Sequence, residues 1–556
     1  MVKKVFNFIS REVGGLHEAA YLLGFFALLS QILALFRDRL LAYTFGASQA
    51  LDIYYTAFRI PDFMFVSVAS LVSMSVLIPF LMERIDKGHK EVKVFIDAVF
   101  SFFFFTIAAI SILAFIFTPF LLKIFFPVEE QDYATLIHMT RIMLLSPIFL
   151  GFSNFLASVT QIYKRFFIYA LSPIFYNLGI IIGIVFFHRL WGMEGLAWGV
   201  ALGAFLHFFI QVPFVLKKGL FPRLRFNAHF REIRSVILTS LPRTLTLSSN
   251  EIAKFFLISF AATMAGGAIS IFNFSWNLQS VPLTIVGVSY SLAAFQVLTR
   301  LYTQGDKKKF VEQMITSSKH IIFWSIPIMV MFIVLRAQIV RVILGSGNFS
   351  WSDTRLTAAA LALFTVSLIP QGLTLLFVRA YYSRGDTKKP LLMNVVSAGL
   401  IIVFSYTLIY LFTTIPFFRY FIQSLLRVDD LPGSLVLMLP LGFSLGTTIN
   451  MIMHWIAYEK DFKGYTSAIM RSLFQTLGAS IIMGYVTYLL LNLFDRIFDL
   501  NTFYGIFMQG FLSGILGIIV GVILLKVLKN KELEVIVSNM KSKIWKTKVI
   551  PPDVAV

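Results

Sequence analysis

The sequence predicts an all-α polytopic membrane protein with about 14 transmembrane helices. Of its 556 residues, 58% are hydrophobic and only 14% are charged, whereas soluble domains average about 45–50% apolar and about 25% charged residues. The apolar residues gather in stretches of about 20 residues, the length that a helix needs to cross a bilayer. The connections between these stretches are alternately basic and non-basic, which is typical of loops on opposite sides of a membrane.

Fourteen apolar stretches are long enough to be membrane spans. They are 19–45, 53–82, 92–126, 133–163, 166–188, 191–216, 234–263, 268–299, 310–344, 354–382, 389–412, 435–459, 465–491 and 504–528. Proline removes a backbone hydrogen bond and bends a helix, so the spans that contain one are expected to be kinked. These prolines are Pro61, Pro147, Pro173, Pro242, Pro282, Pro327 and Pro370.

The loops between the spans place both ends of the chain in the cytoplasm. Every second connection is basic, and Lys and Arg concentrate in the cytoplasmic loops of membrane proteins. The basic connections lie at 84–93, 164–165, 217–231, 307–309, 384–389 and 460–463, whereas 46–52, 127–132 and 345–353 are neutral or acidic. The excess of 48 Lys and Arg over 28 Asp and Glu therefore indicates contact with an anionic membrane surface and not with a nucleic acid.

Two similar segments predict an internal duplication. Residues 141–174 and 363–396 both contain a proline within a helix, a long apolar run, a basic turn and a further apolar helix. This repeat predicts two six-helix lobes, 19–220 and 221–460, followed by two additional helices within 461–528. Transporters often consist of such repeats, with the substrate site at their interface.

Both ends of the chain are basic. Residues 1–18 are amphipathic and lack the apolar core and cleavage site of a signal peptide, so they are expected to form a helix along the membrane surface. Residues 529–556 are predicted to be a basic cytoplasmic tail.

Charged residues in and beside the first two spans are the main indication of function. Arg37, Asp38 and Arg39 are adjacent in the first span, Asp52 precedes the second, and Arg59 lies within it. A charge at the centre of a membrane helix costs roughly 2.5–3.5 kcal/mol on insertion scales, so it normally faces a partner or a water-filled cavity. One interpretation is a self-neutralising cluster that locks two helices together. The other is a slightly cationic chamber, in which arginine favours a phosphate or diphosphate because its planar group donates paired hydrogen bonds.

A second polar group lies on the seventh predicted span. Asn250, Glu251 and Lys254 fall within one helical turn. Glu251 and Lys254 are three residues apart and can pair with each other, so self-neutralisation and a place in the cavity both remain open. Asn177 and Asn277 are further polar residues inside spans.

Several classes of site are absent from the sequence. There is no cysteine, so disulfides and thiolate metal sites cannot form. The eight His residues show no metal-ligand spacing, and the chain has no P-loop, G-x-S-x-G elbow or H-E-x-x-H motif. We expect no metal, no cofactor and no enzymatic activity, and the short outer loops also argue against a membrane glycosyltransferase.

One stretch carries a resemblance to a known family. Residues 36–62, FRDRLLAYTFGASQALDIYYTAFRIPD, resemble the MurJ/MviN family of lipid II flippases, in a superfamily with the multidrug (MATE) and polysaccharide exporters. The shared features are an R-D pair, F-G-A, an Asp before an aromatic residue and A-F-[RK]-[IL]-P. Residues 381–390, YYSRGDTKKP, and 141–147, RIMLLSP, are similar to two further family patterns.

The resemblance implies both a fold and an activity. The fold is fourteen helices in two lobes. Members of the family move undecaprenyl-diphosphate-linked disaccharide-pentapeptide from the inner to the outer leaflet, through an alternating-access cavity lined by basic residues. By position, Arg37, Asp38 and Asp52 correspond to polar cavity residues of the first two helices.

Three positions depart from the family pattern. Gln31, Phe65 and Asn277 stand where an arginine is usual. Arg39 and Arg59 are the hypothesised replacements, and their neutral substitution should then abolish transport. The candidate substrate-binding residues are Gln31, Arg37, Asp38, Arg39, Asp52, Arg59, Asn250, Glu251, Lys254 and Asn277.

Three functions remain as alternatives. The first is a lipid II flippase of the plasma membrane, with lipid II and membrane lipids as partners and cell-wall synthesis proteins as further candidates. The second is export of another polyprenyl-linked oligosaccharide, which the three missing arginines favour. The third is a non-transporting scaffold for cell-wall enzymes, which would have little reason to keep polar residues inside its spans.

Overall fold

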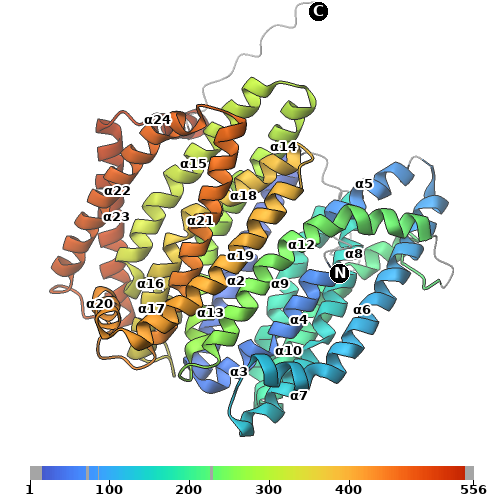
Figure 1. Cartoon of the computed structure of the whole chain (residues 1–556), viewed down its shortest axis with the longest axis horizontal. Helices are drawn as coiled ribbons and strands as arrows, with labels where there is room; N and C mark the ends of the chain where they lie inside the picture. Colours follow the sequence, from blue (N-terminus) through green and yellow to red (C-terminus); the bar gives the residue numbers. More distant parts are fainter. Residues whose placement is uncertain (1–15, 70–73, 86, 164, 226–229, 545–556) are drawn as a thin grey trace, which may run out of the picture. The chain divides into compact units, whose positions relative to one another are not determined.

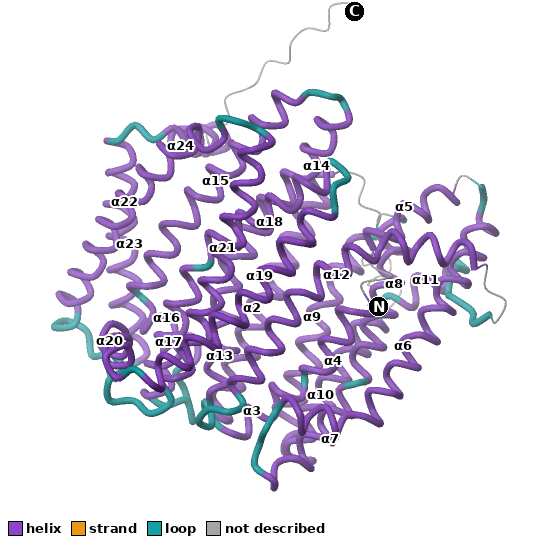
Figure 2. Tube along the Cα trace, in the orientation of Figure 1, coloured by secondary structure: helices purple, strands orange, loops and turns teal. Residues whose placement is uncertain are grey.

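The computed structural model describes residues 16–69, 74–85, 87–163, 165–225 and 230–544. These residues form helices joined by turns and loops, with no β-strand among them (Figure 2). The predicted all-α fold is confirmed. The predicted surface helix at 1–18 lies almost entirely outside the described residues.

The first part of the chain, up to residue 217, forms helices of very different lengths (Figure 1). They are α2 (Leu16–Phe45), α3 (Gln49–Ala57), α4 (Arg59–Met64), the π-helical η1 (Phe65–Ala69), α5 (Met74–Ile85), α6 (His89–Phe125), the 3-10 turn η3 (Glu130–Asp132), α7 (Tyr133–Met143), α8 (Leu145–Ile162), α9 (Phe166–Ile182), the π-helical η4 (Gly183–Phe187), α10 (His188–Phe209) and α11 (Val212–Lys217).

The second part begins with another long helix. Its elements are α12 (Phe230–Ala261), α13 (Ala268–Pro282), the π-helical η5 (Leu283–Val288), α14 (Ser289–Thr303), α15 (Lys307–Val334), α16 (Arg336–Leu344), α17 (Trp351–Val366), α18 (Leu368–Ser383), α19 (Lys388–Thr414), α20 (Pro416–Leu426), the 3-10 turn η6 (Ser434–Leu437), α21 (Met438–Asp461), α22 (Tyr465–Phe494), α23 (Phe503–Val527) and α24 (Lys531–Ile544).

Ten helical stretches of the described chain are long and apolar enough to cross a membrane. One of them, Phe166–Lys217, has 52 residues and reverses direction at Trp191 and Gly192, whose backbone angles are not helical. Helices α9 and α10 then pack side by side (Figure 1), because Gly183 meets Gly199 with no side chain between them. Three other predicted spans are not among these ten stretches, and they contain α2, the α3–α5 segment and α12. The total of fourteen stays a prediction.

At three prolines a predicted span is interrupted in the same way. In each case the preceding helix ends four residues before the proline, because proline has no N–H to bond that carbonyl. The pairs of helix end and proline are Ala57 and Pro61, Met143 and Pro147, and Val366 and Pro370. The predicted span 53–82 is therefore not one helix but α3, α4, η1 and α5. The last two breaks lie at matching places of the predicted repeat, while the boundaries of the two lobes stay a prediction.

The chain packs as two compact units that do not follow its linear order. Unit 1 comprises Met1–Leu278, Ile343–Leu363 and Thr387–Gly446, and unit 2 comprises Gln279–Val342, Phe364–Asp386 and Thr447–Val556. All ten candidate substrate-binding residues belong to unit 1.

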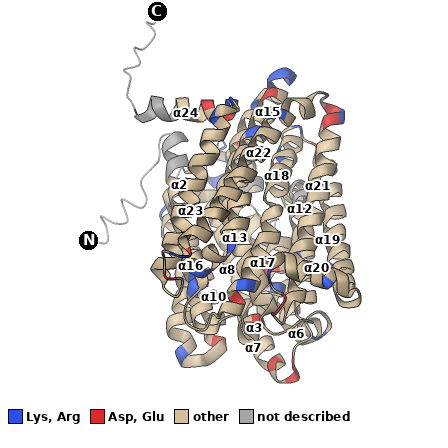
Figure 3. Ribbon diagram, turned by 90° about the vertical axis from the view of Figure 1, so that its left-hand side faces the viewer, with Lys and Arg blue, Asp and Glu red and all other residues tan. Residues whose placement is uncertain are grey.

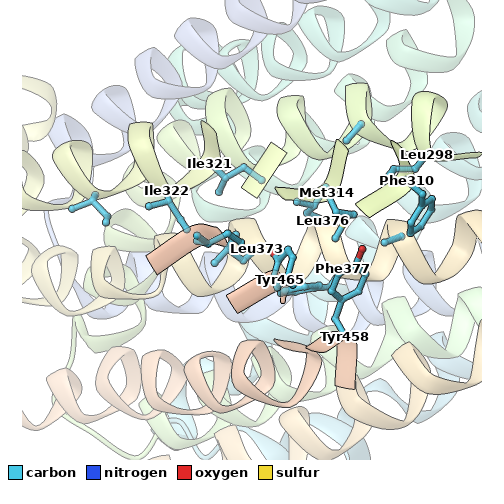
Figure 4. Close-up of a cluster of buried hydrophobic side chains, with 14 residues drawn as sticks. Leu298, Phe310, Met314, Ile321, Ile322, Leu373, Leu376, Phe377, Tyr458 and Tyr465 are labelled. Atoms are coloured by element: carbon cyan, nitrogen blue, oxygen red, sulfur yellow. The ribbon is translucent and has the colours of Figure 1, made fainter. Parts of the chain in front are cut away.

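Unit 2 has an apolar core where α15, α18, α21 and α22 meet (Figure 4). Phe310 and Ile321 of α15 pack there with Phe377 of α18, Tyr458 of α21 and Tyr465 of α22. In a membrane, close packing of these side chains is what holds the helices together, because lipid chains are as apolar as the side chains themselves.

Two helices lie where the sequence indicated only a loop and a tail. Helix α20 occupies part of the expected connection 413–434, and α24 covers part of the predicted tail 529–556. Helix α24 packs within unit 2 through Leu533, and its Glu532 Oε1 lies 3.8 Å from Lys319 Nζ. Both helices are shorter than a membrane span, so the apolar length of the sequence does not indicate them.

Candidate functional site

Charged residues are sparse, and most of the ribbon in Figure 3 carries neither sign. An exception in α2 is the adjacent pair of Arg37 and Asp38. Arg37 donates from Nε and Nη2 to Asp38 Oδ1 over 3.0 and 2.8 Å, and from Nη1 to Asn177 Oδ1 of α9 over 3.1 Å. Asp38 Oδ2 accepts a bond of 2.9 Å from Asn277 Nδ2 of α13. We refer to Arg37, Asp38, Asn177 and Asn277 as the Arg37 network.

Burial makes the Arg37 network energetically important. The Asp38 side chain is 3% exposed and that of Arg37 is 19% exposed. Removing one partner of a buried ion pair costs about 3–5 kcal/mol, because the other charge is left uncompensated. Both oxygens of Asp38 are hydrogen-bonded, whereas Arg37 directs three of its five N–H donors at described residues. Arg37 is therefore the member of the network with donors to offer a ligand.

Asp52 holds the start of α13. Its Oδ2 accepts a bond of 2.7 Å from Gly267 N, and its Oδ1 accepts bonds of 2.7 and 2.6 Å from Ser270 N and Ser270 Oγ. The N–H groups of a first helical turn have no partner within the helix, and a carboxylate there also complements the helix dipole. These three bonds give the buried Asp52 a structural role, since they tie α3 to α13.

Arg39 contacts a different part of the chain from Arg37. Its Nη1 donates to Ile343 O, near the end of α16, over 3.2 Å. Asn348 follows that helix and donates from N to Tyr43 O over 3.0 Å and from Nδ2 to Thr44 O over 2.7 Å. The end of α2 is thus bonded to the connection between α16 and α17.

The Asp52 and Arg39 contacts belong to one packed group of loops in unit 1. Ala47 N donates to Asp353 Oδ2 over 3.4 Å, and Gly267, at φ +90°, lies so close to Ala47 that a Cβ would clash with its carbonyl. We refer to residues 43–52, 265–270 and 343–355 together as the loop junction.

A second group of charges lies on α4 and α12. Arg59 is buried, and its Nη2 lies 3.6 Å from Asp62 Oδ2. Asp62 also interacts electrostatically with Glu251 and Lys254 of α12. Lys254 Nζ lies 5.2 Å from the centre of the Trp276 ring, within the range of a cation–π interaction. We refer to Arg59, Asp62, Glu251 and Lys254 as the Asp62 group.

The Arg37 network and the Asp62 group form one polar region, since Tyr176 interacts electrostatically with both Arg37 and Asp62. This region contains three basic and three acidic side chains, so its formal charges cancel. They are Arg37, Arg59 and Lys254 against Asp38, Asp62 and Glu251. The sequence suggested a slightly cationic chamber; the balance differs because Arg39 and Asp52 contact the loop junction and Asp62 joins the polar region.

The remaining candidates lie beside this region. Gln31 is half-buried on α2, and it shares a helix face with Asp38 because the two are seven residues, or about 10 Å, apart. Asn250 is exposed on α12. Sequence reasoning did not assign Asp62 or Asn177 to the site. The signals were present, since Asp62 closes the FRIPD motif and Asn177 is polar inside a span.

Unit 1 also contains an apolar cavity, of about 560 Å³. It is lined by Leu145, Phe149, Phe187, Trp191, Trp198, Ala201, Leu202 and Phe205. A lining without polar side chains does not suit a charged headgroup. Among the described residues, no three His, Asp or Glu side chains lie close enough together to bind a metal ion.

Comparison with known proteins identifies the family by sequence. The family described as "Lipid II flippase MurJ" matches residues 41–509. The probable lipid II flippase MurJ of Buchnera aphidicola subsp. Schizaphis graminum is 25% identical over 501 residues, which cover 87% of this chain and 93% of that protein. The probable lipid II flippase MurJ of Thermotoga maritima is 25% identical over 462 residues, covering 81% of this chain and 92% of that protein.

Solved structures agree on the fold. The structure of "Lipid II flippase MurJ, inward closed conformation" superposes with a TM-score of 0.73 at 23% identity, covering 91% of this chain and 99% of that chain. An inward-facing MATE multidrug transporter of the MOP superfamily superposes with a TM-score of 0.63 at 16% identity, covering 79% of this chain and 96% of that chain. Together with the sequence match over most of its length, this establishes that the chain belongs to the MurJ family of lipid II flippases.

Proposed function

We propose that this protein is a lipid II flippase, which moves the undecaprenyl-diphosphate-linked peptidoglycan precursor from the inner to the outer leaflet of the plasma membrane. Membership of the MurJ family supports this function. The structural observation that carries it is the Arg37 network, in which apolar helices far apart in the sequence converge on the pair of Arg37 and Asp38. Such intramembrane charges mark substrate pathways more often than they serve packing alone.

Arg37 is the proposed contact for the diphosphate. A guanidinium donates charge-assisted bonds to phosphate oxygens, and Arg37 retains N–H donors beyond those it directs at Asp38 and Asn177. Asp38 orients the guanidinium but also repels an anion. The balanced charges of the polar region therefore favour moderate affinity, which suits a transporter because the headgroup must leave on the other side.

The proposal includes an orientation and a cycle. Both termini lie in the cytoplasm. The cavity between two six-helix lobes opens alternately to the two sides of the membrane. The headgroup crosses in this cavity while the polyprenyl chain stays in lipid. In this orientation the loop junction lies on the outer side, because it contains the non-basic connections 46–52 and 345–353. Its contacts would then hold unit 1 closed on that side, and opening it would complete the cycle. Cell-wall synthesis proteins stay predicted partners.

Complementation tests the function. A bacterium depleted of its own lipid II flippase is supplied with this chain, with Arg37→Ala or with Arg496→Ala, whose arginine is exposed after α22. We expect growth with the intact chain and with Arg496→Ala but not with Arg37→Ala at equal membrane levels. Rescue by Arg37→Ala equal to that of the intact chain would contradict the proposed site.

A second measurement distinguishes lipid II from other polyprenyl-linked glycans, the alternative that Gln31, Phe65 and Asn277 favour. A hydrolase that cannot cross the membrane and that cuts the diphosphate of lipid II is added to the depleted cells. If the chain flips lipid II, the precursor becomes susceptible to the hydrolase when the intact chain is present. If the inserted chain leaves the precursor protected, the chain does not flip lipid II, and the proposed function is wrong.

A further inference from the structure

Helix α20 (Pro416–Leu426) presents a stripe of apolar side chains to its surroundings. Phe417, Tyr420, Phe421 and Leu425 are 81%, 59%, 54% and 61% exposed. With Ser424, which is also exposed, they occupy one face because their spacing follows the helical repeat of 3.6 residues. In water such a stripe of large side chains would be unfavourable.

The opposite face of α20 fixes the helix within unit 1. Ile422, Gln423 and Leu426 are buried, and Gln423 Nε2 donates to Ser434 Oγ over 2.8 Å. The helix ends at Arg427, which adopts a left-handed conformation at φ 59°. The apolar stripe is therefore held outward by a packed and hydrogen-bonded face.

The position of α20 along the chain puts this stripe at a membrane surface. Helix α20 begins two residues after the end of α19, and η6 and α21 follow after a short loop. The stretches on both sides, Lys388–Thr414 and Ser434–Asp461, are long and apolar enough to be spans. Because consecutive spans leave the bilayer at the same surface, the connecting helix lies at the level of the lipid headgroups there.

The charges of α20 suit an anionic lipid. Arg419 lies in α20 and Arg427 directly follows it, whereas acidic residues begin only at Asp429 and Asp430, of which Asp430 is paired with Arg355. The Arg419 guanidinium lies 5.0 Å from the centre of the Tyr420 ring, at the edge of the stripe. Aromatic rings favour the headgroup level of a bilayer, and basic residues beside an apolar face bind anionic lipids.

We propose that α20 is an in-plane helix that inserts Phe417, Tyr420, Phe421 and Leu425 into the lipid leaflet, with Arg419 and Arg427 on lipid phosphates. The partner is an anionic lipid leaflet, which is the outer one in the orientation proposed above; the insertion itself does not depend on that orientation.

This lipid contact is joined to the loop junction. Arg355 of α17 donates from Nη2 to Arg427 O over 2.6 Å, and it binds the Asp430 carboxylate through Nη1 and Nη2 over 2.8 and 2.7 Å. Two residues earlier in α17, Asp353 accepts the bond from Ala47 N. The end of α20 is thus bonded directly to Arg355, which is itself a residue of the loop junction.

Single-cysteine labelling tests the insertion in the full-length protein, because the chain has no cysteine of its own. An environment-sensitive fluorophore is attached at Phe421→Cys, or at Asp429→Cys in the exposed loop after the helix, and each protein is placed in phosphatidylglycerol-containing nanodiscs. We expect the label at 421 to be quenched by nitroxide-bearing lipid chains and protected from iodide, with the reverse at 429. Equal iodide quenching at both positions would overturn the proposal, as would protection from both quenchers at 421, which would indicate a protein partner or a second copy.

The role of the arginines is tested by lipid composition. In the Phe421→Cys background, protection from the uncharged quencher acrylamide should be stronger in phosphatidylglycerol than in phosphatidylcholine nanodiscs. Arg419→Gln together with Arg427→Gln should remove this difference while the basal protection remains. A difference that persists in the double variant, or that is absent in the parent, would overturn the assignment of the arginines to anionic lipid.

Discussion

Asn277 donates its side-chain amide to Asp38 Oδ2 over 2.9 Å, and this bond joins α13 to the ion pair of α2. The resemblance described above implies an arginine at this position. A neutral amide satisfies the carboxylate but adds no charge, so Arg37 is the cation that balances Asp38. With Asn277 in place of an arginine, the network therefore stays hydrogen-bonded, and the charges of the polar region cancel.

The bond between Asn277 and Asp38 should be visible as an energetic coupling. Asn277→Ala should lower the free energy of unfolding by about 1.5–3 kcal/mol, the usual value for a hydrogen bond to a charged group. In an Asp38→Ala background the same change should cost less, since its acceptor is gone. Reversible unfolding of the four proteins in detergent gives the cycle, and additive effects would contradict the contact.

Arg37→Lys should impair transport although it keeps the charge. One ammonium cannot reproduce bonds to both Asp38 and Asn177 in the planar geometry of a guanidinium. Losing one bond to a charged group, about 1.5 kcal/mol or more, predicts a transport rate at least about tenfold lower, since 1.4 kcal/mol is a factor of ten. The measurement is the rate at which lipid II becomes accessible outside the cell, with Arg496→Lys as the control. An unchanged rate would show that charge alone suffices.

Asp52→Asn should loosen the loop junction. The amide keeps one acceptor but turns an N–H group toward donors from Gly267 and Ser270, and the lost capping interaction is worth about 0.5–2 kcal/mol. A cysteine at Ala268, which is buried beside these donors, should then react several-fold faster with a water-soluble thiol reagent. Ser270→Ala, which removes only one of the three bonds, should show a smaller increase. Equal reactivity in all three proteins would mean that Asp52 does not hold the junction.

The Arg355–Asp430 pair should persist in mild acid. The hydrogen bonds from Arg355 hold the pKa of the exposed Asp430 carboxyl below its usual value. A carboxyl with a lowered folded pKa stabilises the protein fully above its unfolded pKa of about 3.9, and this contribution is lost only as the pH falls through the lower folded value. Asp430→Asn should therefore lower the melting temperature by the same amount at pH 7 and pH 5. A smaller effect at pH 5 would place the pKa of Asp430 higher than its contacts imply.

Much of the fold could be read from the sequence because apolar length and loop charge follow directly from the bilayer. The predicted spans are largely helical where the structure describes them, and prolines mark breaks such as the one between Ala57 and Pro61. The π-helical turn at η1 and the short helices α20 and α24 were not predicted. They depend on packing against distant residues, as when Leu533 of α24 joins a cluster with Phe323.

The site was predictable only in part, for the same reason. Arg37 and Asp38 are neighbours in the sequence, so their pairing needed no tertiary information. Their partners Asn177 and Asn277 lie 140 and 239 residues away, and no local pattern distinguishes them from other polar residues in spans. The sequence indicated which residues carry charge, while their grouping required the fold.

The close packing of α9 on α10 should control the Arg37 network, because α9 carries Asn177. Adding a methyl group at Gly203 of α10 would make it clash with the backbone carbonyl of Tyr176, next to Asn177. Gly203→Ala should therefore cost about 1–3 kcal/mol of stability, as overpacking does, and reduce transport by displacing the acceptor of Arg37. Gly399→Ala is the matched control, since it places the same methyl group on α19 with no neighbour within 4 Å and should be neutral or stabilise by about 0.4–1 kcal/mol. If both variants transport lipid II at the rate of the parent, α9 does not need this register to position Asn177, and the bond to Arg37 is dispensable.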